Sequence, residues 1–208
     1  MSLFQVLLIT HIATGTLSLV LGLYLVIAKK GTPIHKRTGK IYFFSMLFVS
    51  IVALPMSYLH PNYFLFLISI FTIYMLLTGI RYLDKKSTTD VKPLDWAYTI
   101  IISLFAVLFI TFGISSIVKS NLFGIVFIVF GCIGLLFSYQ DRQNFKGHAK
   151  IKNYFLTTHL QRMTGSYVAA TTAFLVVNNK ILPSVVAWLL PTIIMAPLII
   201  KWTRKYKT

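Results

Sequence analysis

The stretch that decides the fold is HIATGTLSLVLGLYLVIAKKGTPIHKRTGKIY, residues 11–42. It contains most of an apolar run that begins at Leu3, a basic segment over residues 29–40, and the start of another apolar run. A helix needs roughly 20 mostly apolar residues to cross about 30 Å of hydrocarbon, and the run over residues 3–28 is long enough. The pattern therefore predicts a membrane-spanning helix, a basic turn and a second spanning helix.

The whole chain has the same apolar character. Of its 208 residues, 57% are hydrophobic and 12% are charged, whereas soluble domains are about 45–50% apolar and about 25% charged. The formal charge is +16, from 20 basic and 4 acidic residues, which in a soluble protein suggests a nucleic-acid partner. Here the basic residues lie between apolar runs, so we predict a bilayer with anionic headgroups as the partner and no nucleic acid.

Seven apolar segments are long enough to span a bilayer. The predicted fold is an all-α integral membrane protein, a single domain over residues 1–208 built as a bundle of seven transmembrane helices. The first segment lacks the basic n-region of a signal peptide, and no small-residue cleavage site follows it, so we expect it to remain as the first helix. The predicted spans are residues 3–28, 40–59, 62–83, 95–118, 121–139, 155–177 and 182–202.

The distribution of Lys and Arg among the loops predicts the orientation. Only Lys119 and Lys180 lie on the side that the N-terminus shares, and Arg162 lies inside a span. Because positive residues stay in the cytoplasm, we predict that the N-terminus is outside and the C-terminus is cytoplasmic. All four acids also lie on or at the cytoplasmic side. The 17 basic residues on that side are Lys29, Lys30, Lys36, Arg37, Lys40, Arg81, Lys85, Lys86, Lys92, Arg142, Lys146, Lys150, Lys152, Lys201, Arg204, Lys205 and Lys207.

The first span carries a row of small residues. Gly15, Ser18 and Gly22 lie on the face of this helix that also holds His11. Small side chains let membrane helices approach each other closely. We interpret the row as a packing seam, with a substrate groove as the alternative.

Ionisable residues within the spans are candidates for function, because a charged side chain at bilayer depth costs at least about 2.5–3.5 kcal/mol. His11 lies roughly 12 Å below the outer end of the first span. It is either a neutral imidazole bonded to a neighbouring helix or a ligand or proton-relay group. His159 and Arg162 are three residues apart, so they share a face of the sixth span near its cytoplasmic end. The alternative for Arg162 is a guanidinium group that extends to the interface.

The best candidate site combines these residues with others at the same membrane level. His35 lies in the basic turn before the second span, and Asp141, which ends the fifth span, is the nearest acid able to neutralise Arg162. We predict that this cytoplasmic-side cluster binds a ligand or cofactor, with His11 as a separate candidate. The alternative is a charge-neutralising cap that holds the helix ends at the interface. The predicted cluster consists of His35, Asp141, His159 and Arg162, with Tyr139 and Gln161 nearby.

The motifs exclude several kinds of chemistry. The chain has no HExxH or CxxC spacing, so we expect no dedicated zinc site. No Ser-His-Asp triad or Gly-rich phosphate loop can be assembled, so hydrolysis and nucleotide chemistry have no support, and a membrane redox role stays open. Axial haem ligation needs only one histidine from each of two helices at similar depth. His35 and His159 meet this condition, whereas His11 and His159 are separated by roughly 11 Å in depth.

Three motifs lie in the predicted spans and in the basic turn. They are His11-x3-Gly15, Lys30-Gly31-x3-His35-Lys36-x2-Gly39-x2-Tyr42 with Met46 after it, and His159-x2-Arg162-Met163-x-Gly165. They resemble an uncharacterised bacterial multi-pass membrane protein family catalogued as domain of unknown function 2306. The resemblance covers the first through the sixth span. It implies a bacterial inner-membrane protein and marks His11, His35, His159 and Arg162 for testing, but it implies no activity, cofactor or substrate. Lys36 stands where the family favours arginine, which keeps the charge and loses the bidentate donor.

Three functions are compatible with the sequence. The favoured one is the binding of a small ligand or a redox cofactor, of quinone or haem type, at the cytoplasmic-side cluster. The second is a small-solute or proton-linked carrier with His11 as an intramembrane proton site. The third is a structural or assembly subunit whose polar residues only satisfy one another. The sequence does not define an oligomeric state.

Overall fold

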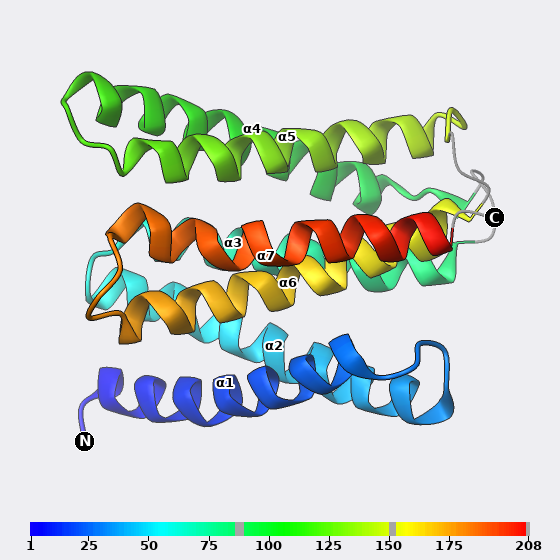
Figure 1. Ribbon diagram of the computed structural model, residues 1–208, viewed down its shortest axis with the longest axis horizontal. Coiled ribbons are helices and arrows are strands. Elements are labelled where there is room, and N and C mark those ends of the chain that lie inside the picture. Colours follow the sequence, from blue (N-terminus) through cyan, green and yellow to red (C-terminus); the bar gives the residue numbers. More distant parts are fainter. Residues whose placement is uncertain (86–89, 150–152, 207–208) are drawn as a thin grey trace. The chain divides into compact units, whose positions relative to one another are not determined.

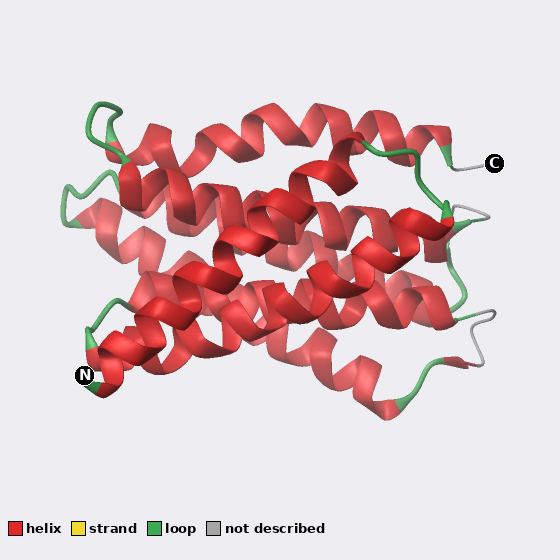
Figure 2. Ribbon diagram, turned by 90° about the horizontal axis from the view of Figure 1, so that it is seen from below, coloured by secondary structure: helices red, strands yellow, loops and turns green. Residues whose placement is uncertain are grey.

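The computed structural model describes residues 1–85, 90–149 and 153–206. Within these ranges the chain forms seven α-helices and no strand (Figures 1 and 2). The all-helical prediction is therefore confirmed. Four of the basic residues used to predict the orientation, Lys86, Lys150, Lys152 and Lys207, lie outside the described residues. The helices are α1 (Leu3–Ile27), α2 (Pro33–Leu59), α3 (Tyr63–Asp84), α4 (Pro93–Val118), α5 (Gly124–Phe145), α6 (Tyr154–Asn178) and α7 (Ser184–Lys205).

Six of these helices are long and apolar enough to cross a membrane, which makes the chain a multi-pass membrane protein. The helix outside this set is α6, which has the length of a span but a polar first half, with Thr157, Thr158, His159, Gln161 and Arg162. Most of the α6 side chains are buried or half-buried, so other parts of the protein cover this helix. A polar helix needs such cover in a membrane, because lipid cannot satisfy its hydrogen-bonding groups.

The predicted basic turn is shorter than expected, because residues 29–32 are not helical but residues 33–40 of the basic segment belong to a helix. Helix α2 begins at Pro33, seven residues before the predicted start of the span at residue 40. The hydroxyl group of Thr32 accepts a hydrogen bond of 3.1 Å from the backbone N–H of His35, and Pro33 takes the first helical position. Both are standard helix-start features. His35 therefore lies in the first turn of a helix, where hydropathy alone predicts a loop.

Lys30 caps the end of α1. Its ammonium group donates hydrogen bonds of 2.6, 2.7 and 3.2 Å to the carbonyl oxygens of Leu25, Val26 and Ala28. These carbonyl groups have no partner within the helix, so the lysine satisfies them as a C-cap. Gly31 follows with a positive φ of 81°, which turns the chain towards α2.

The chain divides into two compact units. Unit 1 comprises residues 1–77 and 163–171, and unit 2 comprises residues 78–162 and 172–208, so α3 and α6 contribute segments to both. In unit 1, α1 and α2 lie side by side (Figure 1). The Ser18 hydroxyl donates a hydrogen bond of 2.9 Å to that of Ser45, and Gly22 faces the ring of Tyr167. The predicted packing seam on α1 thus includes Ser18 and Gly22, whereas nothing lies within 4 Å of a Cβ at Gly15.

In unit 2, α4 and α5 form a closely packed hairpin (Figure 1). Glycine permits the close approach near the loop that joins them, because a Cβ at Gly113 would lie 2.7 Å from the carbonyl oxygen of Gly124. The hydroxyl groups of Ser103 and Ser138 are 2.5 Å apart further along the same contact. Helix α5 continues six residues past the predicted end of its span at residue 139, so Asp141 lies within the helix, one turn before its end.

Candidate functional site

A buried ion pair joins α5 and α6 in unit 2. Nη2 of Arg162 lies 2.9 Å from Oδ1 of Asp141, and both side chains are 0% exposed. The same nitrogen donates a hydrogen bond of 3.0 Å to the carbonyl oxygen of Phe137, and the guanidinium carbon lies 3.7 Å from the centre of the Phe137 ring. Arg162 therefore does not extend to the interface, and the predicted pairing with Asp141 is present.

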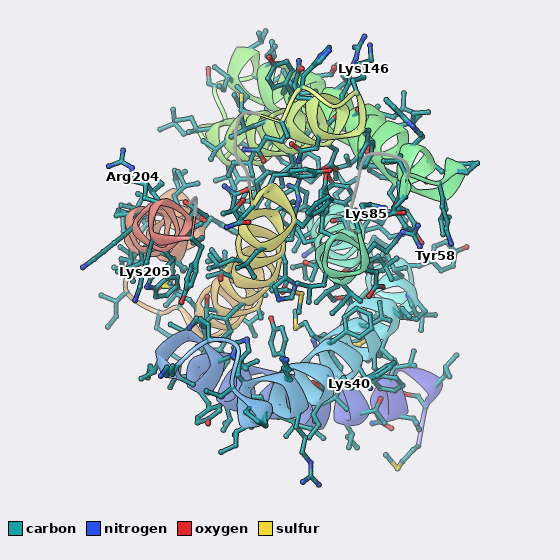
Figure 3. The ribbon with its side chains drawn as sticks, turned by 90° about the vertical axis from the view of Figure 1, so that its right-hand side faces the viewer. Lys40, Tyr58, Lys85, Lys146, Arg204 and Lys205 are labelled. Atoms are coloured by element: carbon teal, nitrogen blue, oxygen red, sulfur yellow. The ribbon has the colours of Figure 1, made fainter. Side chains whose placement is uncertain are left out.

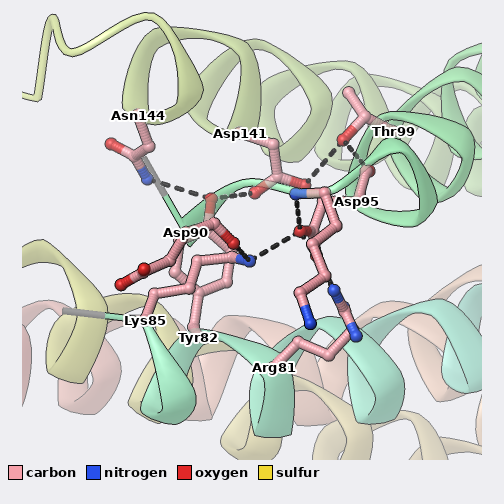
Figure 4. A network of polar contacts seen from close by, with 9 residues as sticks. Arg81, Tyr82, Lys85, Asp90, Asp95, Thr99, Asp141 and Asn144 are labelled. Atoms are coloured by element: carbon pink, nitrogen blue, oxygen red, sulfur yellow. Dashed lines mark hydrogen bonds and ion pairs between the residues drawn. The ribbon is translucent and has the colours of Figure 1, made fainter. Parts of the chain in front are cut away.

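Neutral side chains complete the surroundings of Asp141. The hydroxyl group of Tyr82 donates a hydrogen bond of 2.8 Å to Oδ1 of Asp141 and accepts one of 3.2 Å from the amide of Asn144 (Figure 4). On the other side, Oγ1 of Thr99 lies 3.5 Å from Oδ2 of Asp141. With Arg162 on α6, these side chains come from four helices: Tyr82 from α3, Thr99 from α4 and Asn144 from α5. Asp141 thus contacts polar side chains from three other helices.

A second carboxylate, Asp95, holds the first turn of α4. Nε and Nη2 of Arg81 donate hydrogen bonds of 2.6 and 3.1 Å to its two oxygens, and Nζ of Lys85 lies 2.6 Å from Oδ2. The backbone N–H of Lys92 donates a fourth hydrogen bond of 2.8 Å, as expected for an acid at the start of a helix. Asp95 and Lys85 are 3% and 4% exposed, so this is also a buried ion pair.

Thr99 connects the two carboxylates. Its hydroxyl group donates a hydrogen bond of 3.1 Å to the backbone carbonyl oxygen of Asp95 and lies beside Asp141. The two ion pairs therefore belong to one group of contacts, which we call the polar network. Figure 4 shows the part of it around Asp95 and Asp141. The polar network consists of Arg81, Tyr82, Lys85, Asp95, Thr99, Asp141, Asn144 and Arg162.

A hollow of about 320 Å³ opens beside the polar network, and five charged residues line it: Arg81, Asp84, Lys85, Asp90 and Lys92. Lys85 belongs both to the wall of the hollow and to the network, and its ammonium group lies between Asp90 and Asp95 (Figure 4). Lys85 is buried, whereas Lys146 and Arg204 are exposed and project outwards in Figure 3. The four acidic residues of the chain all belong to the network or to the wall of the hollow.

The other predicted residues have different surroundings. Nδ1 of His159 lies 2.8 Å from the carbonyl oxygen of Gly79, so His159 joins α6 to α3 and does not contact Asp141 through this nitrogen. His11 and His35 belong to unit 1; among the described residues no hydrogen-bond partner lies beside the buried Nδ1 atom of His35, and His11 interacts with the backbone of Val49. Their role in binding a cofactor stays a prediction. Tyr139 is 59% exposed and lies outside the polar network, and Gln161 is half-buried.

The residues of unit 2 match a haem site only in part. A carbonyl oxygen only accepts hydrogen bonds, so Nδ1 of His159 is the donor, and a metal-ligating histidine usually makes such a bond with the nitrogen that does not bind the metal. His148, the other histidine of unit 2, is exposed and lies in a loop. The hollow has charged walls, whereas pockets for large cofactors are mostly apolar. Among the described residues, no group of three His, Cys, Asp or Glu side chains could hold a metal ion.

Sequence reasoning missed most of the polar network. It assigned Arg81 and Lys85 to the set of topology-determining charges, and it did not single out Tyr82, Thr99 or Asn144. One local pattern does point to Asp95: a proline at position 93 followed two residues later by an acid is typical of the first turn of a helix. Comparisons with protein-family models, curated proteins and solved structures gave no match to this chain.

Proposed function

We propose that the chain crosses a bacterial inner (plasma) membrane seven times, with α6 as a further span, the N-terminus outside and the C-terminus cytoplasmic. The charge distribution supports this orientation, because 17 of 20 basic residues then face anionic headgroups on the cytoplasmic side. The pairing of Arg162 with Asp141 supports α6 as a span, because it neutralises the one arginine within that helix. The resemblance to domain of unknown function 2306 belongs to the same proposal.

Cysteine labelling in whole cells tests the orientation. The positions are Asn121→Cys, in the α4–α5 loop, and His148→Cys, after α5, both in a Cys132→Ser background. A membrane-impermeant maleimide should label the first position and not the second. Labelling of the second position alone would reverse the orientation.

We further infer that the hollow and the polar network bind a small charged solute on the cytoplasmic side. One observation carries this inference: Lys85, at 4% side-chain exposure, lines the hollow and at the same time bonds to Asp95. A solute in the hollow therefore meets groups that are already held in place by the network. Fixed polar groups that converge on a concave surface are typical of ligand sites. The charged lining favours a polar solute over haem or quinone.

Ligand binding and a purely structural role predict different effects of added solutes on the unfolding temperature. The experiment uses purified protein in detergent, with the unfolding temperature measured in the presence of small anions, cations and zwitterions. Ligand at about ten times its dissociation constant stabilises the native state by about 1.4 kcal/mol. At least one class of solute should raise the unfolding temperature. The increase should fall in Lys92→Gln, an exposed residue of the wall, and persist in Lys146→Gln, an exposed residue outside it. No stabilisation by any class would favour the structural role.

A proton-linked carrier is a second candidate, and the completely buried Asp141–Arg162 pair favours it. Ionisable pairs inside membrane proteins often mark proton or substrate pathways. Uptake into liposomes should then depend on pH in the wild type and lose that dependence in a variant that carries both Asp141→Asn and Arg162→Gln. A His11→Ala variant tests the separate histidine, since unchanged pH dependence would exclude His11 from the mechanism.

A further inference from the structure

We propose that the solute bound in the hollow is a zwitterion of the amino-acid type. The proposal deepens the proposed binding function and depends on it. It starts from the charges that line the hollow: three cationic residues, Arg81, Lys85 and Lys92, and two acidic ones, Asp84 and Asp90.

The neighbouring carboxylate of Asp95 decides the balance of these charges. It accepts hydrogen bonds from both Arg81 and Lys85, so one negative charge offsets one of their two positive charges. With Lys92, two positive charges remain, and Asp84 and Asp90 supply two negative ones. The charges of these described residues therefore sum to zero, and groups of both signs are present. A solute with a single charge gains one attraction there and also meets like charges, whereas a zwitterion can place each end beside its opposite.

The donors and acceptors fit both ends of such a solute. Arg81 has five N–H donors, of which two bond to Asp95, so further donors can bind a carboxylate. The ammonium group of Lys92 adds three donors, because only the backbone of this residue bonds to Asp95. The exposed carboxylates of Asp84 and Asp90 can accept hydrogen bonds from an ammonium group. A volume of about 320 Å³ is large enough for a small amino acid.

An aromatic residue beside the site provides a signal for binding. Trp96 follows Asp95, and its ring lies 5.3 Å from that of Phe145, edge to face. The ammonium group of Lys85 lies 5.9 Å from the centre of the same Phe145 ring. A solute that shifts Lys85 should therefore change the fluorescence of Trp96, and a Trp188→Phe, Trp202→Phe background removes the other two tryptophans.

The experiment measures the binding of matched probes to the purified full chain by calorimetry and by Trp96 fluorescence. A panel of neutral L-amino acids is compared with the deaminated acid and the decarboxylated amine of each; for L-alanine these are propionate and ethylammonium. We expect an amino acid to bind at least tenfold more tightly than both of its analogues. Binding should weaken at least tenfold in Lys92→Gln and in Asp84→Asn, and stay unchanged in Lys146→Gln.

Three outcomes would overturn the proposal. If propionate binds as tightly as L-alanine and Lys92→Gln abolishes the binding of both, the site binds anions. The proposed binding function is then correct, and the proposal of a zwitterionic solute is wrong. If an amino acid binds equally well to wild type, Lys92→Gln and Asp84→Asn, its site is elsewhere. If no amino acid, anion or cation binds, both the zwitterion and the proposed binding function fail.

Discussion

Tyr42 in unit 1 and Tyr82 in unit 2 are both almost completely buried, at 2% and 1% exposure, and each hydroxyl group bonds to another helix. The partner of Tyr42 is the hydroxyl group of Ser166, at 2.9 Å. The partner of Tyr82 is the carboxylate of Asp141, at 2.8 Å. The two tyrosines therefore serve the same geometric purpose in chemically different surroundings.

The difference extends to the whole of each region. The contacts described around Tyr42 are neutral ones: the Ser18–Ser45 hydrogen bond and an apolar cluster with Met46 and Leu76. The contacts around Tyr82 include two buried carboxylates and their cationic partners. A neutral seam is sufficient to pack membrane helices. Buried charges are costly and are not needed for packing, so their presence in unit 2 supports the proposal of a binding site there.

The largest expected effect comes from breaking the Asp141–Arg162 pair. Arg162→Met leaves a carboxylate that is 0% exposed without its cation, and removing one partner of a buried pair costs about 3–5 kcal/mol. We expect this loss in the free energy of unfolding, measured by denaturant titration in detergent micelles. The double variant Asp141→Leu, Arg162→Met should recover most of the stability, since it leaves no buried charge. If the single variant is as stable as wild type, the pair does not hold α5 and α6 together.

The second prediction concerns Asp95. Asp95→Asn leaves the ammonium group of Lys85, at 4% side-chain exposure, without its carboxylate. We expect a loss of about 3 kcal/mol, the lower end of the range for buried pairs, because Arg81 is 26% exposed and can rehydrate. Lys85→Met should restore part of the loss when combined with Asp95→Asn. An effect below about 0.5 kcal/mol would show that Asp95 behaves as a surface residue.

Hydropathy and charge patterns predict helices well and their polar contacts poorly in this chain. The seven helices match the seven predicted segments, because length and apolar content are local properties of the sequence. The start of α2 differs because Thr32 and Pro33 extend the helix into a basic segment where apolar content is low. The Arg162–Asp141 pair could be predicted, because the two residues have opposite charges and lie at a similar level in the predicted bundle. The contribution of Tyr82 could not be predicted from the sequence. Other tyrosines also lie near span ends, and it is the three-dimensional packing that brings Tyr82 to Asp141.

The third prediction compares the two tyrosines directly. Tyr82→Phe removes a donor to a charged carboxylate, and such hydrogen bonds contribute about 1.5–3 kcal/mol, whereas the neutral bond lost in Tyr42→Phe contributes about 0.5–1.5 kcal/mol. Both losses are measured as free energies of unfolding under the same conditions. We also expect Tyr82→Phe to alter binding in the hollow and Tyr42→Phe to leave it unchanged. Equal effects of the two variants on binding would remove the functional distinction between the regions.

The smallest expected effect tests whether unit 1 depends on shape alone. Gly22→Ala on α1 places a methyl group against the ring of Tyr167, whereas Gly15→Ala places one where no heavy atom lies within 4 Å. Both variants gain the same helix propensity, about 0.8–1.0 kcal/mol, so their difference isolates the steric effect. Overpacking typically costs about 1–3 kcal/mol, and the half-buried Tyr167 ring can move, so we expect Gly22→Ala to be less stable than Gly15→Ala by about 1 kcal/mol. Equal stabilities would mean that the ring moves without loss, and close packing at Gly22 would then not account for the contact between α1 and α6 in unit 1.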